Sequence, residues 1–210
     1  MFLSRLRLHP RDLDVLRDIA DAEQLHRTVM RAFPQHDGSD ARAAFRVLFR
    51  LEFDRERRPV ALVQSAVQPA WDKLSEGYLL QHESKEISGF LDAIESGRRF
   101  RFRLLANPSK KVANGGRNSR RVALLDEAQQ RDWLRRRAER GGFELPVDDG
   151  LLIAPKRPLG KGGKGRPGLH VRPVLYEGLL TVTDADAFRQ TLIAGIGPAK
   201  AYGCGLLSVA

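Results

Sequence analysis

The chain has 210 residues, with 36 Lys and Arg against 26 Asp and Glu, so its formal net charge is +10. A basic excess of this size favours a polyanionic partner, first a nucleic acid and second a membrane surface, over an acidic small molecule. The single cysteine, Cys204, excludes an intrachain disulfide and a cysteine-based zinc cluster. Because there is no leader pattern and no apolar run long enough to span a membrane, we expect a soluble, cytoplasmic protein with no membrane partner.

The first half predicts four strands and two helices. In chain order these are strand 2–8, helix 21–34, strands 45–53 and 59–67, helix 88–95 and strand 98–106. The first helix has the clearest signal, because Asp21 and Gln24 make a capping-box pattern before an apolar stripe. The order strand, helix, strand, strand, helix, strand is that of a ferredoxin-like unit.

The second half repeats this order. Its elements are strand 121–124, helix 126–140, a hairpin of 147–154 with 169–182, helix 183–194 and a terminal strand from 206. The sequence therefore predicts an α+β protein of two tandem ferredoxin-like (βαββαβ) domains. We place them at 1–108 and 120–210, with a basic linker at 109–119.

The C-terminal segment is rich in glycine around one lysine. The residues concerned are Gly195, Gly197, Lys200, Gly203 and Gly205. A helix precedes this loop and a short strand follows it, which is the reverse of the order in dinucleotide-binding and P-loop motifs. Glycine backbones can turn their N–H groups towards an anion, so the segment predicts a phosphate seat with Lys200 as a point charge. The alternative is a loop that braces the first helix and the domain interface.

His26 lies on the border of the apolar stripe of the first helix, beside Leu25 and Val29. Such a histidine can be half shielded and still reach solvent; from position alone, a purely packing role is the commoner outcome. The other histidines, His9, His36, His82 and His170, have no partner at metal-ligand spacing, and no HExxH motif occurs. We therefore expect no metal and no other cofactor.

Three basic segments are candidates for RNA binding. In the strand at 98–106, arginines alternate with apolar residues, which suits either a row along a phosphate backbone or the solvated face of an edge strand. A basic loop follows, and the tip of the second hairpin has no acidic residue. The candidates are Arg99, Arg101 and Arg103 in the strand, Lys110, Lys111, Arg117 and Arg120 in the loop, and Lys156, Arg157, Lys161, Lys164 and Arg166 in the hairpin. For the arginines of helix 126–140, the simplest interpretation is a helix face exposed to solvent. The sequence leaves open whether they contact RNA or another subunit.

Four blocks of sequence carry a resemblance. They are Met1–Leu6, Leu25–Thr28, Arg101–Pro108 and Gly203–Val209, and they lie in order along nearly the whole chain. Together with the glycine-rich C-terminal loop, they resemble the CRISPR repeat endoribonucleases of type I-E within the repeat-associated RNA-processing (RAMP) superfamily.

The resemblance implies a metal-independent endoribonuclease in which His26 transfers a proton while a 2′-hydroxyl attacks its own phosphodiester. The implied products are a 2′,3′-cyclic phosphate and a 5′-hydroxyl end. Some relatives have tyrosine where this chain has Glu23, so Glu23 is either a substitute proton carrier or an ordinary first-turn carboxylate. Arg27 and Arg31 are on the exposed side, and Arg31 is our candidate for the charge on the scissile phosphate.

The resemblance implies two partners, the CRISPR repeat hairpin and the other Cascade subunits. The second hairpin of the protein, with Lys156 and Arg157 at its base, would enter a groove of the RNA stem-loop. We expect the free protein to be a monomer. Two alternatives remain at this point. One is a non-catalytic scaffold that binds the RNA hairpin, and the other is a basic nucleic-acid-binding protein without hairpin preference.

Overall fold

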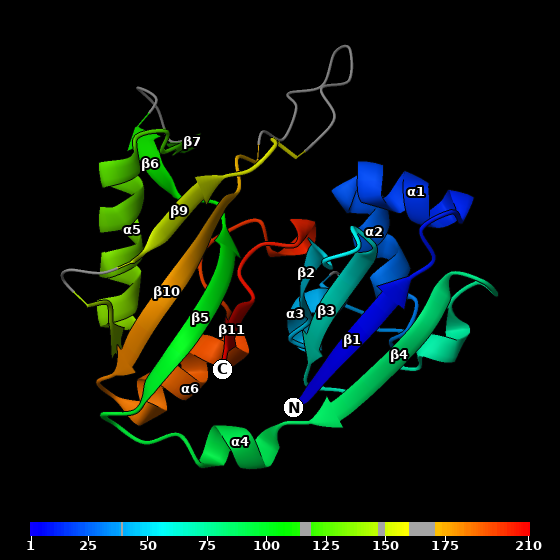
Figure 1. The fold of residues 1–210 in the computed structure, drawn as a ribbon, viewed down its shortest axis with the longest axis horizontal. Coiled ribbons are helices and arrows are strands. Elements are labelled where there is room, and N and C mark those ends of the chain that lie inside the picture. The colour runs from blue at the N-terminus through cyan, green and yellow to red at the C-terminus, as the bar shows by residue number, and fades with distance from the viewer. Residues whose placement is uncertain (39, 114–118, 147–149, 160–170) are drawn as a thin grey trace.

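The computed structural model describes residues 1–38, 40–113, 119–146, 150–159 and 171–210. Two antiparallel sheets lie side by side, and each packs its helices over its own hydrophobic core (Figure 1). This arrangement confirms the prediction of two ferredoxin-like units in tandem. No helix in the described ranges is long and apolar enough to cross a membrane.

The first unit has the strand order β2-β3-β1-β4. Its strands are β1 (Phe2–Leu8), β2 (Leu48–Phe53), β3 (Pro59–Ser65) and β4 (Leu79–Glu86). Its helices are α1 (Leu13–Ala20), α2 (Ala22–Met30) and the short α3 (Ala41–Ala44), with a 3-10 turn η1 (Trp71–Lys73) before β4. Leu25 and Val29 of α2 are buried against Leu6, Leu8 and Phe49 of the sheet.

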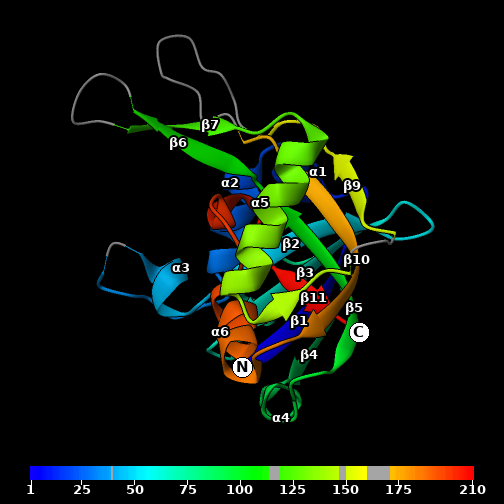
Figure 2. The ribbon, with the colours of Figure 1, turned by 90° about the vertical axis from the view of Figure 1, so that its left-hand side faces the viewer.

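The second unit has the order β11-β5-β10-β8, and β9 also pairs with β10. Its strands are β5 (Arg99–Ala106), β8 (Phe143–Glu144), β9 (Leu152–Pro155), β10 (Val174–Val182) and β11 (Leu207–Val209). Helices α5 (Glu127–Arg140) and α6 (Ala185–Ala194) cover one face of this sheet, and a 3-10 turn η2 (Lys200–Tyr202) lies in the glycine-rich segment. The hairpin β6 (Ser109–Ala113) and β7 (Ser119–Ala123) projects from the end of β5 near the start of α5 (Figure 2).

The assignment of strand 98–106 to the first sheet is wrong, because β5 pairs with β10 and β11 in the second sheet. The fourth strand of the first sheet is β4, whose side chains from Leu80 to Glu86 are all exposed, so it gives no apolar signal. The short helix α4 (Ser88–Asp92) therefore connects the two sheets, and residues 109–119 do not. The predicted strand 121–124 corresponds to β7, which pairs with β6 alone among the described strands.

Aspartates begin most of the helices. Asp126 accepts a hydrogen bond from the backbone N–H of Gln129, as its position predicts, and Asp21 accepts one from the backbone N–H of Glu23. The helix α1 was not predicted, although Asp12 caps it in the same way. These caps satisfy backbone N–H groups that have no partner inside the helix.

Two buried polar side chains connect the units. Arg50 of β2 donates to the backbone oxygens of Leu206 at 2.8 Å and Arg103 at 3.1 Å. Gln64 of β3 donates through Nε2 to the oxygen of Leu192 at 2.8 Å. Because buried polar groups are costly to leave unpaired, these bonds fix how the two sheets face each other.

Candidate functional site

His26 lies on α2 and is half-buried. Its ring stacks on Phe49 of β2, with the ring centroids 6.1 Å apart and 16° between the planes. The Nδ1 atom is buried and has no hydrogen-bond partner in the described part of the chain, which leaves Nε2 as the nitrogen that can meet a substrate. Burial lowers the pKa of His26 from its usual value, and the positive charge of Arg42 lowers it further.

The glycine-rich loop reaches this histidine through Phe49. Gly203 has a φ of 78°, and a Cβ placed on it would lie 3.3 Å from the Phe49 ring. The turn η2 packs beside α2 (Figure 1). Side chains from α2 and β2 and the backbone of the C-terminal loop therefore meet at one point, where they hold the imidazole ring in place.

Several charged side chains surround His26. Arg27 donates to Glu23 Oε1 at 2.6 Å, and both side chains are more than half exposed. Arg31 is exposed at the end of α2. Arg42 of α3 was not predicted; its Nη2 lies 3.6 Å from Asp40, and its side chain is largely covered. Since α3 is a four-residue helix without an apolar stripe, no sequence pattern marks Arg42.

Several backbone N–H groups of the glycine-rich loop donate to carbonyl oxygens of the loop itself and of β5. The N–H of Gly205 donates to Leu105, that of Ile196 to Gly205 and that of Gly203 to Lys200. The ammonium of Lys200 donates to the oxygen of Ala194 at 2.6 Å, at the end of α6. These bonds tie the loop to β5 and to the end of α6, which supports the bracing role that the sequence left as an alternative, while the N–H groups of Gly197 and Ala199 have no backbone partner among the described residues.

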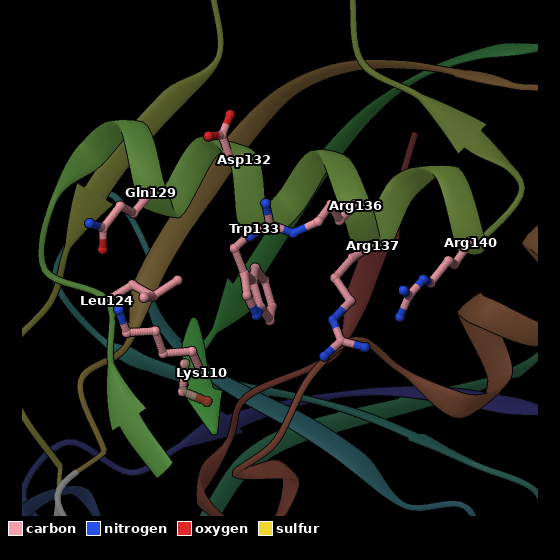
Figure 3. A pocket seen from close by; sticks show the side chains of 9 residues that line it. Lys110, Leu124, Gln129, Asp132, Trp133, Arg136, Arg137 and Arg140 are labelled. Atoms are coloured by element: carbon pink, nitrogen blue, oxygen red, sulfur yellow. The ribbon is translucent and has the colours of Figure 1, made fainter. Parts of the chain in front are cut away.

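A basic pocket of about 420 Å³ lies along α5. Figure 3 shows Arg136, Arg137 and Arg140 on one side of this helix with Trp133, and Lys110 of β6 approaching from below. Arg137 lies over the Trp133 ring, with 5.5 Å from Cζ to the ring centroid. Within the ranges that the structure describes, the buried Trp133 Nε1 and Ser109 Oγ have no hydrogen-bond partner.

The glycine-rich loop joins this pocket to the His26 region. A Cβ on Gly197 would lie 3.0 Å from the Trp133 ring. Burial lowers the pKa of Lys200, and the charges of Arg42 and Arg137 lower it further. We call this continuous set of cations, from Arg140 through Arg137, Lys200 and Arg42 to His26, the basic tract.

The arginine row of β5 is not part of the basic tract. Phe100, Phe102 and Leu104 of this strand are buried against α5 and α6, so Arg99, Arg101 and Arg103 point from the opposite face of the sheet. Arg103 forms ion pairs with Glu177 and, at 3.3 Å, with Glu52. Arg103 also lines a cavity that reaches Leu25 and Phe49, but Arg99, Arg101 and His26 do not line it.

The remaining predicted RNA-binding residues divide into four groups. Lys110 lines the pocket on α5, and Lys111 is exposed beside it. Lys156 and Arg157 are exposed at the mouth of a cavity of about 610 Å³ that also contacts Leu25 and Phe49. The backbone of Arg120 pairs with Val112, while four further candidates lie outside the described residues: Arg117, Lys161, Lys164 and Arg166.

The arginines that line the pocket on α5 were left open by sequence analysis. They follow the buried Trp133 at spacings of three, four and seven residues, which places them on its side of the helix. A buried tryptophan inside an arginine-rich helix is the signal that could have identified this face. Among the described residues, no group of three His, Cys, Asp or Glu side chains could hold a metal ion.

Known proteins resemble this chain along its whole length. A profile of the CRISPR associated protein family matches residues 1–210. The chain is 39% identical to CRISPR-associated endoribonuclease Cse3 of Thermus thermophilus over 100% of both sequences. It is 34% identical to CRISPR system Cascade subunit CasE of Escherichia coli, over 90% of this chain and 92% of that protein. The structure of CRISPR endoribonuclease Cse3 bound to 19 nt RNA matches at a TM-score of 0.83 and 38% identity, covering 100% of both chains.

Proposed function

The chain belongs to the CRISPR-associated protein family, among the endoribonucleases Cse3 and CasE, and from this membership we infer that it binds a CRISPR repeat stem-loop and cleaves precursor CRISPR RNA. The observation that carries the inference beyond family membership is the basic tract, which ends at His26, a half-buried histidine on α2. A polyanion seated along the tract would bring one phosphodiester to His26.

The pocket on α5 is the proposed contact for the backbone of the stem. Lys110 and three arginines of α5 supply positive charge and hydrogen-bond donors. Phosphate oxygens accept hydrogen bonds from such groups. Since the major groove of A-form RNA is deep and narrow, contacts of this kind recognise the shape of a stem more than its sequence.

We propose that His26 acts as the general base. Its depressed pKa favours the neutral imidazole near neutral pH, so Nε2 can accept the proton of a 2′-hydroxyl. The O2′ atom then attacks the adjacent phosphorus, the bond from phosphorus to O5′ breaks, and O5′ takes up a proton. The products are a 2′,3′-cyclic phosphate and a 5′-hydroxyl end, and no step requires a metal ion.

Cations near His26 would stabilise the negative charge that develops on the phosphorane. Arg31 and Arg27 are exposed on the same helix, and Lys200 and Arg42 approach from the C-terminal loop and α3. Glu23 holds Arg27 by an ion pair, which supports an orienting role for this carboxylate. We propose that Arg31 and Arg27 contact the scissile phosphate and that Glu23 positions Arg27.

The relationship to a Cascade subunit supports a second part of the proposal. After cleavage the protein stays on the processed RNA and joins the other Cascade subunits in the cytoplasm. Because the product is retained, each protein molecule would complete only a single turnover.

A specific observation favours one competing function. Glu23 stands where some relatives have tyrosine, and its carboxylate is already engaged with Arg27. A protein without a second proton carrier could bind the hairpin as a scaffold and fail to cut it.

The test is incubation of a labelled repeat hairpin from the host's own CRISPR array with the protein in excess chelator. We expect one cut beside the 3′ base of the stem, and binding that is tighter than binding to an unrelated duplex of equal length. Tight binding without a cut would support the scaffold, and equal affinity for both RNAs would support a basic protein without hairpin preference. The first result would overturn the proposed cleavage, and the second would overturn the proposed preference for the hairpin.

A further inference from the structure

A cleft lies between the open faces of the two sheets, on the side of the second sheet opposite to α5 and α6. It has a volume of about 770 Å³, and Figure 1 shows the strands that line it, with β2 and β3 of the first unit facing β5 and β11 of the second. We call it the inter-sheet cleft. The lining residues that matter here are Arg50, Glu52, Leu62, Arg101, Leu152 and Leu179.

A network of ion pairs fixes the floor of the inter-sheet cleft. Arg50 is only 2% exposed, and it donates to Glu52 at 2.7 Å and to Ser208 Oγ at 3.0 Å. Arg103 joins the network through its pairs with Glu52 and Glu177. Because these contacts come from both units, the cleft is formed before any partner binds. Binding therefore requires little loss of conformational entropy in the cleft.

The walls of the inter-sheet cleft are apolar and accessible. Leu62 of β3 and Leu179 of β10 line it from opposite units, and both are partly exposed. Leu152 at the start of β9 is 49% exposed at its edge. Accessible leucines around a preformed concave site are typical of surfaces that bind protein.

The rim of the inter-sheet cleft is cationic. Arg101 lines the cleft, Arg99 follows it on the same face of β5, and Arg5 is opposite Leu62 in the register of β1 and β3. In contrast to Arg103, these three guanidiniums form no ion pair with any residue that the structure describes. A carboxylate on a partner would satisfy them.

The same features disfavour RNA in the inter-sheet cleft. Proteins that bind single-stranded RNA on a sheet stack the bases on exposed aromatic rings. Here the rings of Phe100, Phe102 and Tyr176 are buried on the other face. The guanidiniums at the floor, those of Arg50 and Arg103, are already paired with Glu52 and Glu177 and are not available to a phosphate backbone.

We propose that the inter-sheet cleft binds a segment of another protein subunit of the Cascade complex. The segment inserts leucine-type side chains between Leu62, Leu152 and Leu179, and it carries at least one Asp or Glu towards Arg101. This inference rests on the proposed function for its choice of partner. RNA on the basic tract leaves the cleft open, so both ligands bind at once.

The experiment places a photo-crosslinking amino acid at position 152 and assembles the complex from the host's own Cascade subunits and repeat RNA. In parallel, Leu152→Asp, Leu152→Lys and the matched control Leu80→Asp are tested for assembly and for hairpin cleavage. Leu80 is 54% exposed on β4 and does not line the inter-sheet cleft. If the bound segment is acidic, Leu152→Asp should weaken incorporation of the protein into the complex at least tenfold, and Leu152→Lys should weaken it less. Leu80→Asp should leave incorporation unchanged.

We expect the crosslink to join a protein subunit, and we expect all three substituted proteins to cut the hairpin at the wild-type rate. A crosslink to RNA would overturn the proposal, and so would full incorporation of Leu152→Asp. Failure of the wild-type protein to cut the hairpin would overturn the proposed activity alone, because the crosslink and the assembly of the complex are read independently of cleavage.

Discussion

At the scale of single residues, His26 owes its chemistry to its surroundings. Phe49 covers one face of the ring, Nδ1 is buried, and the cation with the largest effect on the pKa is Arg42. Asp40 and Glu23 act in the opposite direction, and Arg27 adds a weaker cationic effect. The balance favours the neutral ring, which a general base requires.

The Arg42 contribution can be measured through pH. Replacing Arg42 with Gln removes a cation that disfavours the imidazolium, so the pKa of His26 should rise. Because the protonated ring cannot accept the 2′-hydroxyl proton, the acidic limb of the cleavage profile should move to higher pH. Single-turnover rates from pH 5 to 8 test this, with Arg11→Gln as the control that leaves the limb in place. A limb that stays put, or moves to lower pH, would contradict the assignment.

Glu23 offers a second test at this scale. Its pair with Arg27 is solvent-exposed, and exposed pairs contribute about 1 kcal/mol or less. We therefore expect Glu23→Gln to slow hairpin cleavage by no more than about fivefold. A loss of about a hundredfold or more in single-turnover rate would instead make Glu23 the second proton carrier.

At the scale of elements, the glycine-rich loop acts as a brace. Gly195 has a φ of 74°, and a Cβ on it would lie 2.7 Å from Leu48 Cδ1 and 2.8 Å from the oxygen of Gly205. The loop therefore depends on glycine for close approach between the units.

The substitution Gly195→Ala tests the brace. Gly97→Ala is its matched control, since Gly97 has a φ of 84° and nothing within 4 Å of its Cβ position. Both variants suffer backbone strain, but only Gly195→Ala also suffers a clash, which should lower its free energy of unfolding by a further ~1–3 kcal/mol. Urea denaturation measures the difference. Equal losses in the two variants would show that the loop does not brace the units.

Elements with a strong local signal were predictable from sequence. Strand β1, the capped helices α2, α5 and α6 and the pairing of β2 with β3 follow from apolar periodicity and aspartate caps. Strand β4 was missed because its side chains are polar and its pairing with β1 is fixed by tertiary contacts. Because β4 was missing from the predicted elements, β5 was assigned to the first sheet, where it does not belong.

The site was predictable only in part. His26 was predicted from its place on α2 and from the family resemblance. The roles of Arg42 and of the arginines of the pocket on α5 depend on tertiary structure and were not predicted. The direction of the β5 row was predicted, but not the fact that it faces the inter-sheet cleft. Distances between elements remote in sequence carry no periodic signal.

At the scale of the whole molecule, the two faces of the second unit have different charge patterns. The face with α5 carries the basic tract, and the open face of the sheet carries leucines with paired carboxylates and arginines. This asymmetry allows RNA and a protein subunit to bind on opposite sides.

Salt dependence tests the RNA face. Each of Arg136→Gln, Arg137→Gln and Arg140→Gln should weaken hairpin binding and reduce the slope of log affinity against log salt by about 1. Arg135→Gln is the control, because Arg135 is exposed on the same helix and does not line the pocket. Equal slopes for the control and the pocket variants would exclude α5 as the phosphate contact.

The most direct test of the central claim, internal attack assisted by His26, compares three cleavage reactions in excess chelator. These are wild-type protein with the repeat hairpin, His26→Ala with the same RNA, and wild-type protein with an RNA that has a single 2′-deoxy nucleotide at the cut site. We expect cutting to a 2′,3′-cyclic phosphate only in the first, with a loss of at least ~100-fold in the second, no cut in the third and unchanged binding in all three. Cleavage of the 2′-deoxy RNA, or a wild-type rate for His26→Ala, would contradict the account.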